Sequence, residues 1–390
     1  MDARMIGPRD RRATLDLNAM AGRRPLGYGR RRRATAIGGA GMARRRQTVT
    51  IKHVAADAGV SLQTVSRVIN NEPNVRAAMA ERVREAITRL GYVPSLAAQR
   101  MGGSRSYLIL ALNDRERTIS DWRARQGTDW VDQMLLGGML TCARHGYRLL
   151  LELVDTHSDR IERELAATIA ALQPDGVILT PPHSDNPLIA ELLDRHDIAF
   201  ARIGAQGGGT GIALSMADEA GARRATEHLL ALGHRRIGFV AGPEDYTTST
   251  QRADGWRGAM RDSGVSCDGL LAVGNFDFSS GEAAAHALLG AAVRPSAILA
   301  SSDQMALGVL AAARERGLSV PEDLSVVSFD DTPIARFAHP PLTAMEQPIA
   351  ATTARAVELI IAQLGGRARP AAPVVIAGEL KVRASTAPPR

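Results

Sequence analysis

Residues 50–101 read TIKHVAADAGVSLQTVSRVINNEPNVRAAMAERVREAITRLGYVPSLAAQRM, and this stretch predicts three short helices with a tight turn between the first two. The hydroxyl of Thr50 suits the N-cap of the first helix, and Gly59 supplies the left-handed residue that ends it. Ser61 caps a second helix over residues 62–70. Its inward face carries Val65, Val68 and Ile69. Two short helices joined by such a turn form the DNA-binding helix-turn-helix, and an ordinary helical hairpin is the alternative.

The N-terminal part of the second helix carries side chains that suit the edges of bases. Because the apolar residues face the core, five residues remain exposed: Leu62, Gln63, Thr64, Ser66 and Arg67. This part of a recognition helix meets the major groove. Gln63 can form two hydrogen bonds to adenine and Arg67 two to guanine, although a solvated surface arginine is the plainer interpretation. The short donors that suit phosphate oxygens are Thr50, Ser61, Thr64, Ser66 and Asn70.

A third helix is expected to start at Asn74 and to end at Gly91, and a shorter segment follows it. Its apolar residues at helical spacing are Val75, Met79, Val83, Ile87 and Leu90. Ser95 then caps the segment 96–101. Six residues are too few for a helix that is stable alone, because nucleation is costly. We therefore expect this segment to be ordered only when something holds it.

The stretch VTIKHVAADAGVSLQTVSRVIN, with NNEPNVRAAMAERVREAITRLGYVPSLAAQRM after it, resembles the DNA-binding headpiece and hinge of the lac repressor/galactose repressor family. The resemblance implies that the hinge folds on operator DNA and that an apolar side chain opens a base step from the minor groove. It assigns the hinge contacts to Ser95, Ala98 and Met101. Met101 stands where the family usually has leucine. His53 stands where the family usually has aspartate, so the first helical turn lacks that favourable negative charge.

The charge of the chain is unevenly distributed. Residues 1–46 carry thirteen arginines and three aspartates, +10, and residues 47–105 carry eight basic and four acidic groups, +4. Since the whole chain is +7, the remainder is −7, so the basic charge lies where DNA would bind. Residues 1–47 are expected to form a basic disordered arm, or else translation starts at Met42. We find no secretory signal, no apolar run long enough to span a membrane, and no metal-like spacing around Cys142 and Cys267.

From residue 106 onward, strand-like and helix-like segments alternate, which predicts parallel sheets covered by helices. The expected strands are 107–112, 148–153, 176–179, 198–203, 212–214, 236–240, 270–273, 297–300, 324–329 and 374–376, with helices such as 131–144, 160–172, 218–232 and 303–316. So long a segment exceeds one core, which favours two lobes. The predicted domains are a headpiece at 48–93, a hinge at 94–105, a first lobe at about 106–214 plus 347–372, and a second lobe at about 215–346 plus 373–390.

The second half extends the resemblance through EHLLALGHRRIGFVAGP at 227–243 and the stretch 300–348, and it is also similar to periplasmic sugar-binding proteins. That fold implies three crossings between lobes and a ligand in the cleft. The matching positions suggest an effector pocket of Arg252, Phe276, Ser302, Asp330 and Gln347. Carboxylate and guanidinium groups suit neighbouring hydroxyls of a sugar or polyol. The plainer alternatives are a cap for Asp330, a surface ion pair for Arg252 and core packing for Phe276.

Three more residues are candidates for the edge of the cleft. Arg202 would meet an acidic effector or remain solvated, and Trp122 and Trp130 would line the cleft or simply pack. Gly207 to Gly211 precede a strand-like segment, so they form a loop and not a nucleotide fingerprint.

No catalytic motif is present in the sequence, and no cofactor is expected. We therefore expect a cytoplasmic transcription regulator, most simply a repressor, that binds pseudo-palindromic operator DNA as a homodimer and responds to a sugar-like effector. Whether the effector releases or tightens DNA binding stays open. A solute-binding protein of a sugar transporter is the alternative, but it requires a signal peptide and no helix-turn-helix.

Overall fold

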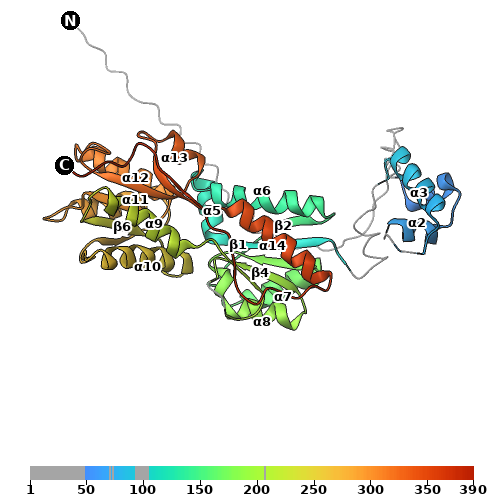
Figure 1. Ribbon diagram of the computed structural model, residues 1–390. Coiled ribbons are helices and arrows are strands. Elements are labelled where there is room, and N and C mark those ends of the chain that lie inside the picture. Colours follow the sequence, from blue (N-terminus) through green and yellow to red (C-terminus); the bar gives the residue numbers. More distant parts are fainter. Residues whose placement is uncertain (1–48, 70–71, 73, 93–104, 206–207) are drawn as a thin grey trace, which may run out of the picture. The chain divides into compact units, whose positions relative to one another are not determined.

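The computed structural model describes residues 49–69, 72, 74–92, 105–205 and 208–390, which fall into two compact units (Figure 1). The small unit ends at Tyr92, and the large unit holds the described residues from Arg105 onward. The expected N-terminal arm and hinge lie outside the described residues.

The small unit is a three-helix headpiece: α1 (Ile51–Ala58), α2 (Leu62–Ile69) and α3 (Ala77–Leu90). Its core is centred on the fully buried Val54, Val65 and Val83, one from each helix. Gly59 ends α1 with a φ of 62°, as predicted, because a residue without a Cβ adopts this left-handed conformation without strain. The predicted start of α3 at Asn74 is wrong: the residues before Arg76 form a turn, and Arg76 itself is the N-cap.

The first lobe of the large unit is a parallel sheet in the order β11-β5-β4-β3-β1-β2. Its strands are β1 (Leu108–Asp114), β2 (Arg148–Val154), β3 (Gly176–Leu179), β4 (Ala199–Ile203), β5 (Ile212–Ser215) and β11 (Val374–Val375). Its helices are α5 (Arg115–Ala124), α6 (Asp129–Arg144), α7 (Ile161–Leu172), α8 (Pro187–Arg195) and α14 (Ile349–Leu364), with a short 3-10 turn at His183–Asp185.

Strand β1 shows how the sequence builds this lobe. Successive strand side chains point to opposite faces of a sheet, so Ile109 and Ala111 pack beneath α6 and α14, while Leu110 and Leu112 pack beneath α7 and α8. Because both faces are covered, the strand is a continuous apolar run and not an alternating one.

The second lobe repeats this plan. Its sheet has the order β12-β10-β9-β8-β6-β7, parallel except for β12, which pairs antiparallel with β10. The strands are β6 (Ile237–Ala241), β7 (Leu271–Val273), β8 (Ala297–Ala300), β9 (Ser325–Asp330), β10 (Thr343–Glu346) and β12 (Leu380–Lys381). The helices are α9 (Asp218–Ala231), α10 (Thr247–Asp262), α11 (Phe278–Leu289), α12 (Asp303–Glu315) and α13 (Pro333–Phe337).

The chain crosses between the lobes three times, as expected: after β5, after β10 and after β11. The predicted last crossing near residue 373 is wrong, because β11 pairs with β5 and so still belongs to the first sheet. The sequence analysis also missed β10 and β12. Both are short, and TAME and LK lack the apolar run that marks the other strands.

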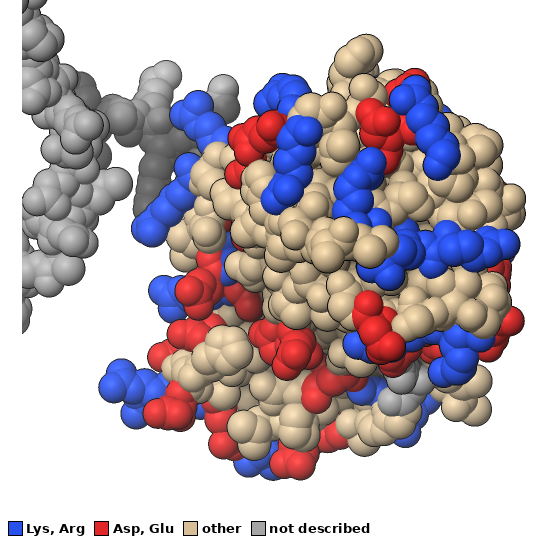
Figure 2. All heavy atoms as spheres, turned by 90° about the vertical axis from the view of Figure 1, so that its left-hand side faces the viewer, with Lys and Arg blue, Asp and Glu red and all other residues tan. Residues whose placement is uncertain are grey.

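On the face of the large unit seen in Figure 2, lysine and arginine side chains lie among aspartate and glutamate side chains. This mixture agrees with the net acidic charge calculated for the chain beyond residue 105. The described residues of this face therefore present no continuous basic field of the kind that attracts the phosphates of DNA.

Helices α6 and α14 lie side by side (Figure 1) and approach closely at two glycines. A Cβ added to Gly137 would lie 1.9 Å from the carbonyl oxygen of Ala350 on α14. One added to Gly138 would lie 3.2 Å from the Thr353 side chain on α14 and 2.7 Å from the Leu149 side chain on β2. Hydrogen at these positions is therefore what lets the two helices cover the sheet together.

We predict that Gly137→Ala destabilises the first lobe, because the added methyl group overlaps a backbone atom that cannot move alone. The free energy of unfolding, measured by denaturant titration, should fall by about 1–3 kcal/mol. Gly365→Ala is the matched control, since its Cβ would lie 3.3 Å from the nearest atom, the carbonyl oxygen of Ala362. Equal losses in the two variants would contradict this account of the helix contact.

Candidate functional site

The described part of the headpiece presents α2 as the sequence predicts. Leu62, Gln63 and Arg67 are exposed, and Thr64 and Ser66 are half-buried. The Ser61 hydroxyl accepts a hydrogen bond from the Thr64 backbone N–H at 3.1 Å, so it caps α2. The guanidinium of Arg67 lies 3.6 Å from the Glu72 carboxylate, and both side chains are open to water. Such a pair is weak and leaves Arg67 available to another partner.

His53 has a structural role that the sequence analysis missed. Its Nδ1 accepts a hydrogen bond from the Thr50 backbone N–H at 3.0 Å, which satisfies one of the unpaired donors at the start of α1. A capping box usually uses glutamate or glutamine for this contact. The histidine thus loses the acidic charge but keeps the reciprocal hydrogen bond.

Four residues assigned to DNA contacts, Asn70, Ser95, Ala98 and Met101, lie outside the described residues. Their roles stay predictions.

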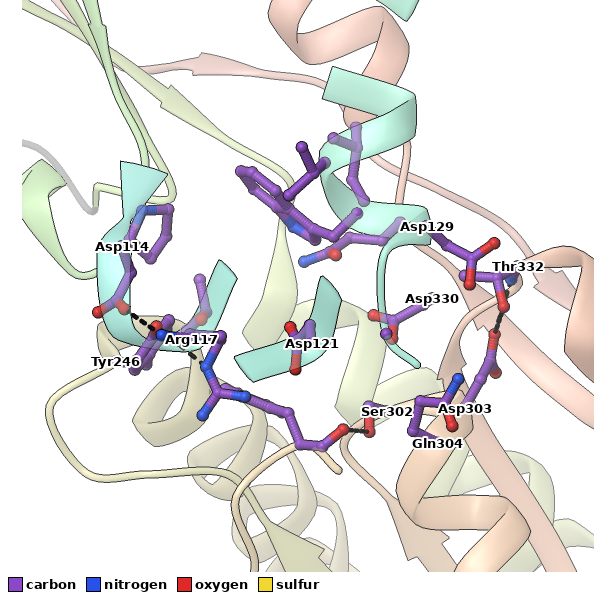
Figure 3. A pocket seen from close by; sticks show the side chains of 18 of the residues that line it. Asp114, Arg117, Asp121, Asp129, Tyr246, Ser302, Asp303, Gln304, Asp330 and Thr332 are labelled. Atoms are coloured by element: carbon purple, nitrogen blue, oxygen red, sulfur yellow. Dashed lines mark hydrogen bonds between the residues drawn. The ribbon is translucent and has the colours of Figure 1, made fainter. Parts of the chain in front are cut away.

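In the large unit, a cavity lies between the two lobes, at the carboxyl ends of their parallel strands (Figure 3). Its empty space, including the open mouth, is about 950 Å³. Asn113 and Asp114 reach it from the end of β1, and Asp330 reaches it from the end of β9. Open parallel sheets bind ligands at this edge. All five residues of the predicted effector pocket line the cavity: Arg252, Phe276, Ser302, Asp330 and Gln347.

A buried polar network forms the second-lobe side of this cavity. The Arg252 guanidinium bonds to Asp218 Oδ1 at 2.8 Å and to the Ser301 carbonyl oxygen at 2.6 Å, and it lies 3.8 Å from Asp330. Its carbon centre is 4.0 Å from the centre of the Phe329 ring. With its amide turned to suit its neighbours, Gln347 accepts from Arg252 and donates to Asp330 at 3.3 Å. Arg252 is thus a buried, fully engaged cation and not a surface ion-pair residue.

Two cavity residues have an unusual backbone. Phe276 has a φ of 59° and Asp330 a φ of 106°, in the region that side chains with a Cβ rarely adopt. Such conformations persist only where the surroundings enforce them, and they gather at functional sites. Burial raises the pKa of Asp330 well above its usual value, although nearby Arg252 opposes this rise. The ionised form of the Asp330 carboxylate is therefore unfavourable here, and a hydrogen bond from a ligand would stabilise it.

The neighbouring Asp303 has a structural role. Its carboxylate accepts hydrogen bonds from the Ser328 hydroxyl at 2.5 Å and from the backbone N–H and hydroxyl of Thr332 at 2.7 and 2.8 Å. Burial raises its pKa to about 6, and these hydrogen bonds hold the shift down. Ser302 caps α12, because its hydroxyl accepts from the Met305 N–H at 3.1 Å.

Arg117, on α5, joins the two lobes, and the sequence analysis did not single it out. Its guanidinium donates to the Tyr246 hydroxyl at 3.2 Å and to the backbone and side-chain oxygens of Asn275 at 2.9 and 2.5 Å. It also lies 5.4 and 5.3 Å from the ring centres of Tyr246 and Phe276. These contacts join the first lobe to the second, and Figure 3 shows the hydrogen bond from Arg117 to Tyr246.

Two acidic residues of the first lobe also line the cavity, Asp121 on α5 and Asp129 at the start of α6. Burial raises the pKa of Asp121 to about 6; Arg117 lowers it, and Asp277 and Asp114 raise it. Burial and the adjacent Asp132 raise the pKa of Asp129. The segment DRERTISDW has no apolar periodicity, so nothing in the sequence marked it as a helix at the cleft.

Of the three further candidates, only Trp130 lines the cavity. Trp122 is exposed and is not part of its wall. Arg202 is buried, and its guanidinium donates to the carbonyl oxygens of Gly208 and Ser184, so it neither meets solvent nor reaches the cleft.

In the part of the chain that the structure describes, no group of three or more histidine, cysteine, aspartate or glutamate side chains is arranged to hold a metal ion. Among the same residues, no helix is both long and apolar enough to cross a bilayer. Cys142 is buried and Cys267 half-buried, and both are free thiols.

Comparison with known proteins gives two family matches. Residues 50–95 match the bacterial regulatory proteins of the lacI family, and residues 226–386 match the periplasmic binding protein-like domain. The regulator CelR of Thermobifida fusca is 34% identical over 349 residues, covering 87% of this chain and 99% of CelR. The ribose operon repressor of Escherichia coli K12 is 32% identical over 302 residues, covering 77% of this chain and 88% of the repressor.

Solved structures give the same picture. A complex of CelR with cellobiose superposes with a TM-score of 0.65 at 31% identity, covering 86% of this chain and 99% of that one. The lac repressor dimer bound to operator and the anti-inducer ONPF superposes with a TM-score of 0.72 at 26% identity, covering 87% and 100%.

Proposed function

This chain belongs to the lacI family of bacterial regulatory proteins. We propose that it is a repressor that recognises its operator through α2, and that a sugar-like effector in the cleft controls its affinity for this DNA. Its similarity to CelR over nearly the whole of that regulator carries the proposal. The chain is a DNA-binding transcription regulator and not an enzyme. We place it in the cytoplasm, where its DNA target lies.

The headpiece supports direct reading of bases by Gln63 and Arg67. Both side chains project from the exposed side of α2, whose buried side packs on α1 and α3. The headpiece also carries short hydroxyl groups that suit phosphate oxygens, at Thr50, Ser61, Thr64 and Ser66. For Asn70, Ser95, Ala98 and Met101, the proposed contacts to phosphate and minor groove rest on the sequence alone.

We predict that Arg67→Ala lowers operator affinity by about 1–3 kcal/mol, which is roughly 5- to 150-fold, because two hydrogen bonds to a guanine are lost. The measurement is a binding titration of operator DNA at fixed salt. Arg84→Ala is the matched control, since Arg84 is also exposed but pairs with Glu81 on α3. Equal losses in the two variants would mean that Arg67 contributes only charge.

The cleft supports a hydroxyl-rich effector. Aspartate and glutamine side chains from the second lobe and aromatic rings from both lobes face one cavity. The CelR structure holds cellobiose, and we propose that this chain binds a related sugar or sugar derivative. Contacts to both lobes would shift the balance between their arrangements, and such coupling typically amounts to about 1–3 kcal/mol.

We predict that Asp330→Asn abolishes the effector response but leaves operator binding intact. The amide removes the charged acceptor that a ligand hydroxyl would meet, and it leaves the headpiece unchanged. Operator release would be followed by fluorescence anisotropy during titration with candidate sugars. Asp254→Asn, at an exposed position on α10, is the control, and a normal response of Asp330→Asn would exclude Asp330 from the pocket.

Helix α6 supports a homodimer. Its outer side presents the exposed Leu136, Met139 and Leu140, spaced so that they form one strip. Contiguous exposed apolar side chains mark interaction surfaces, and the lac repressor structure, similar to this one, is a dimer. We propose that this strip meets the same strip of a second chain, as two-fold symmetry requires.

We predict that Leu140→Glu converts the dimer into single chains, because a carboxylate would be buried in an apolar contact. Sedimentation equilibrium would give the mass. Val293→Glu is the control, since Val293 is 62% exposed and Leu140 is 60% exposed. A mass that stays at two chains in Leu140→Glu would place the interface elsewhere, and a mass near four chains in the unmodified protein would contradict the dimer.

A further inference from the structure

The cleft holds two carboxylates without a cationic partner. Asp121 and Asp129 both line the cavity (Figure 3), and among the described residues neither forms an ion pair. Among these residues the carboxylate of Asp121 accepts no hydrogen bond, and that of Asp129 interacts with its own backbone N–H and with the like charge of Asp132. Both groups are partly removed from water, and this burial outweighs what favours their charged forms, which is the nearby charge of Arg117 for Asp121 and a backbone hydrogen bond for Asp129.

The two cations of the cavity wall do not supply it. Arg252 is occupied by Asp218 and the Ser301 carbonyl oxygen beneath the second lobe. Arg117 is occupied by Asn275 and Tyr246 across the cleft mouth. The lining of the cavity holds five aspartates against these two arginines, so acidic groups outnumber basic ones. Among the described residues, the lining carboxylates with neither an ion pair nor a hydrogen bond from another residue are those of Asp121 and Asp129.

The aromatic residues of the cavity also suit a cation. The guanidinium of Arg117 lies over the rings of Tyr246 and Phe276, so two of these rings already hold a positive charge. Trp130, next to Asp129 in the chain, lines the cavity as well. In the described part of the chain, no arginine or lysine lies over its ring.

The charge of the ligand decides the energy of binding. A ligand that fills the cleft displaces water, and the repulsion among carboxylates grows as the effective dielectric constant falls. A neutral sugar donates hydrogen bonds but leaves this repulsion in place, and an anionic sugar adds to it. An ammonium group beside Asp121 offsets the repulsion and supplies the donor that this carboxylate lacks.

We infer that the effector carries a protonated amino group beside its hydroxyls, as an amino sugar does, and that Asp121 binds this group while Asp129 adds to the negative potential of the cavity. This assignment rests on the proposed function, because it specifies the ligand of the same cleft.

The test is calorimetric titration of the full chain with matched sugars. The pairs are cellobiose and the β-1,4 dimer of glucosamine, glucose and glucosamine, and galactose and galactosamine, with the N-acetylated dimer as an uncharged form with the same linkage. At least one amine should bind about tenfold more tightly, or better, than its neutral counterpart. Neutral members that bind as tightly as the amines, or an absence of binding by every amine, would overturn the inference.

Variants locate the amino group. Asp121→Asn and Asp129→Asn keep the shape and remove the charge, so each should weaken the binding of the amine about tenfold. Asp194→Asn is the matched control, because Asp194 is an exposed aspartate on α8 of the same lobe and is not part of the cavity wall. If both cavity variants bind the amine as tightly as the unmodified chain does, the assignment of the amino group to these carboxylates is wrong.

A pH series gives an independent reading. Asp121 faces Asp114, Arg117 and Asp277, and Asp129, Asp330 and Arg252 line the same cavity. Its pKa of about 6 means that it takes up a proton as pH falls from about 7 to about 5. Protonation removes the partner of the ammonium group, so the affinity for the amine should fall over this range in the unmodified chain and change less in Asp121→Asn. An affinity that is flat or rises toward low pH contradicts the inference.

The outcomes separate this inference from the proposed function. If a neutral sugar binds and changes operator affinity while no amine does, the regulator stands and the ligand assignment fails. If an amine binds through Asp121 but leaves operator affinity unchanged, the ligand assignment stands and the regulatory role of the cleft fails.

Discussion

The ion pair of Arg252 and Asp218 is the interaction on which the cleft depends. The two side chains are 4% and 0% exposed, and charges so buried are stable only when they satisfy each other. Arg252 comes from α10, Asp218 from the start of α9, and the carbonyl that Arg252 also binds lies just after β8. The pair therefore fixes the ends of three elements at one point, and Gln347, on the second crossing between lobes, joins the same network. Removal of either partner would leave a buried charge and loosen the whole side of the cavity.

This constraint also sets the electrostatic character of the cleft. The buried Asp218 carboxylate compensates the charge of Arg252. Arg252 therefore positions Asp330 and Gln347 and does not offer an unpaired charge to a ligand. The hydrogen-bond donors of Arg117 are likewise engaged from the opposite lobe, by neutral oxygens and aromatic faces, although its charge is not cancelled there. Two arginines in the wall of a pocket would ordinarily suggest an anionic ligand. Here their hydrogen bonds are already made, and the acidic groups decide what the cleft accepts.

Much of this architecture could be predicted from the sequence because local patterns specify it. The buried strands are apolar runs, the headpiece helices carry caps and left-handed glycines, and the motifs around Ser302 and Asp330 place the cavity at strand ends. The rest depends on contacts that no local pattern records. Arg117 meets Asn275 from 158 residues away, and α5 has too few apolar side chains to appear as a helix. The sequence analysis also missed the role of His53. Histidine lacks the negative charge that is favourable at the start of a helix, but its ring nitrogen still accepts the capping hydrogen bond.

The position of Asp121 connects ligand binding to the contact between the lobes. Arg117 and Asp121 are four residues apart on α5, so they lie on one side of the helix, and the charge of Arg117 already lowers the pKa of Asp121. A ligand shifts a conformational equilibrium only as far as its affinity differs between the two states. A cation bound by Asp121 supplies such a difference. It competes with Arg117 for the negative charge of Asp121, and its repulsion of the Arg117 guanidinium weakens the contacts of Arg117 with the second lobe. A neutral ligand in the same place does not change the contacts of Arg117 with the second lobe. On this proposal, the charge of the effector determines both its affinity for the cleft and the arrangement of the lobes that it favours.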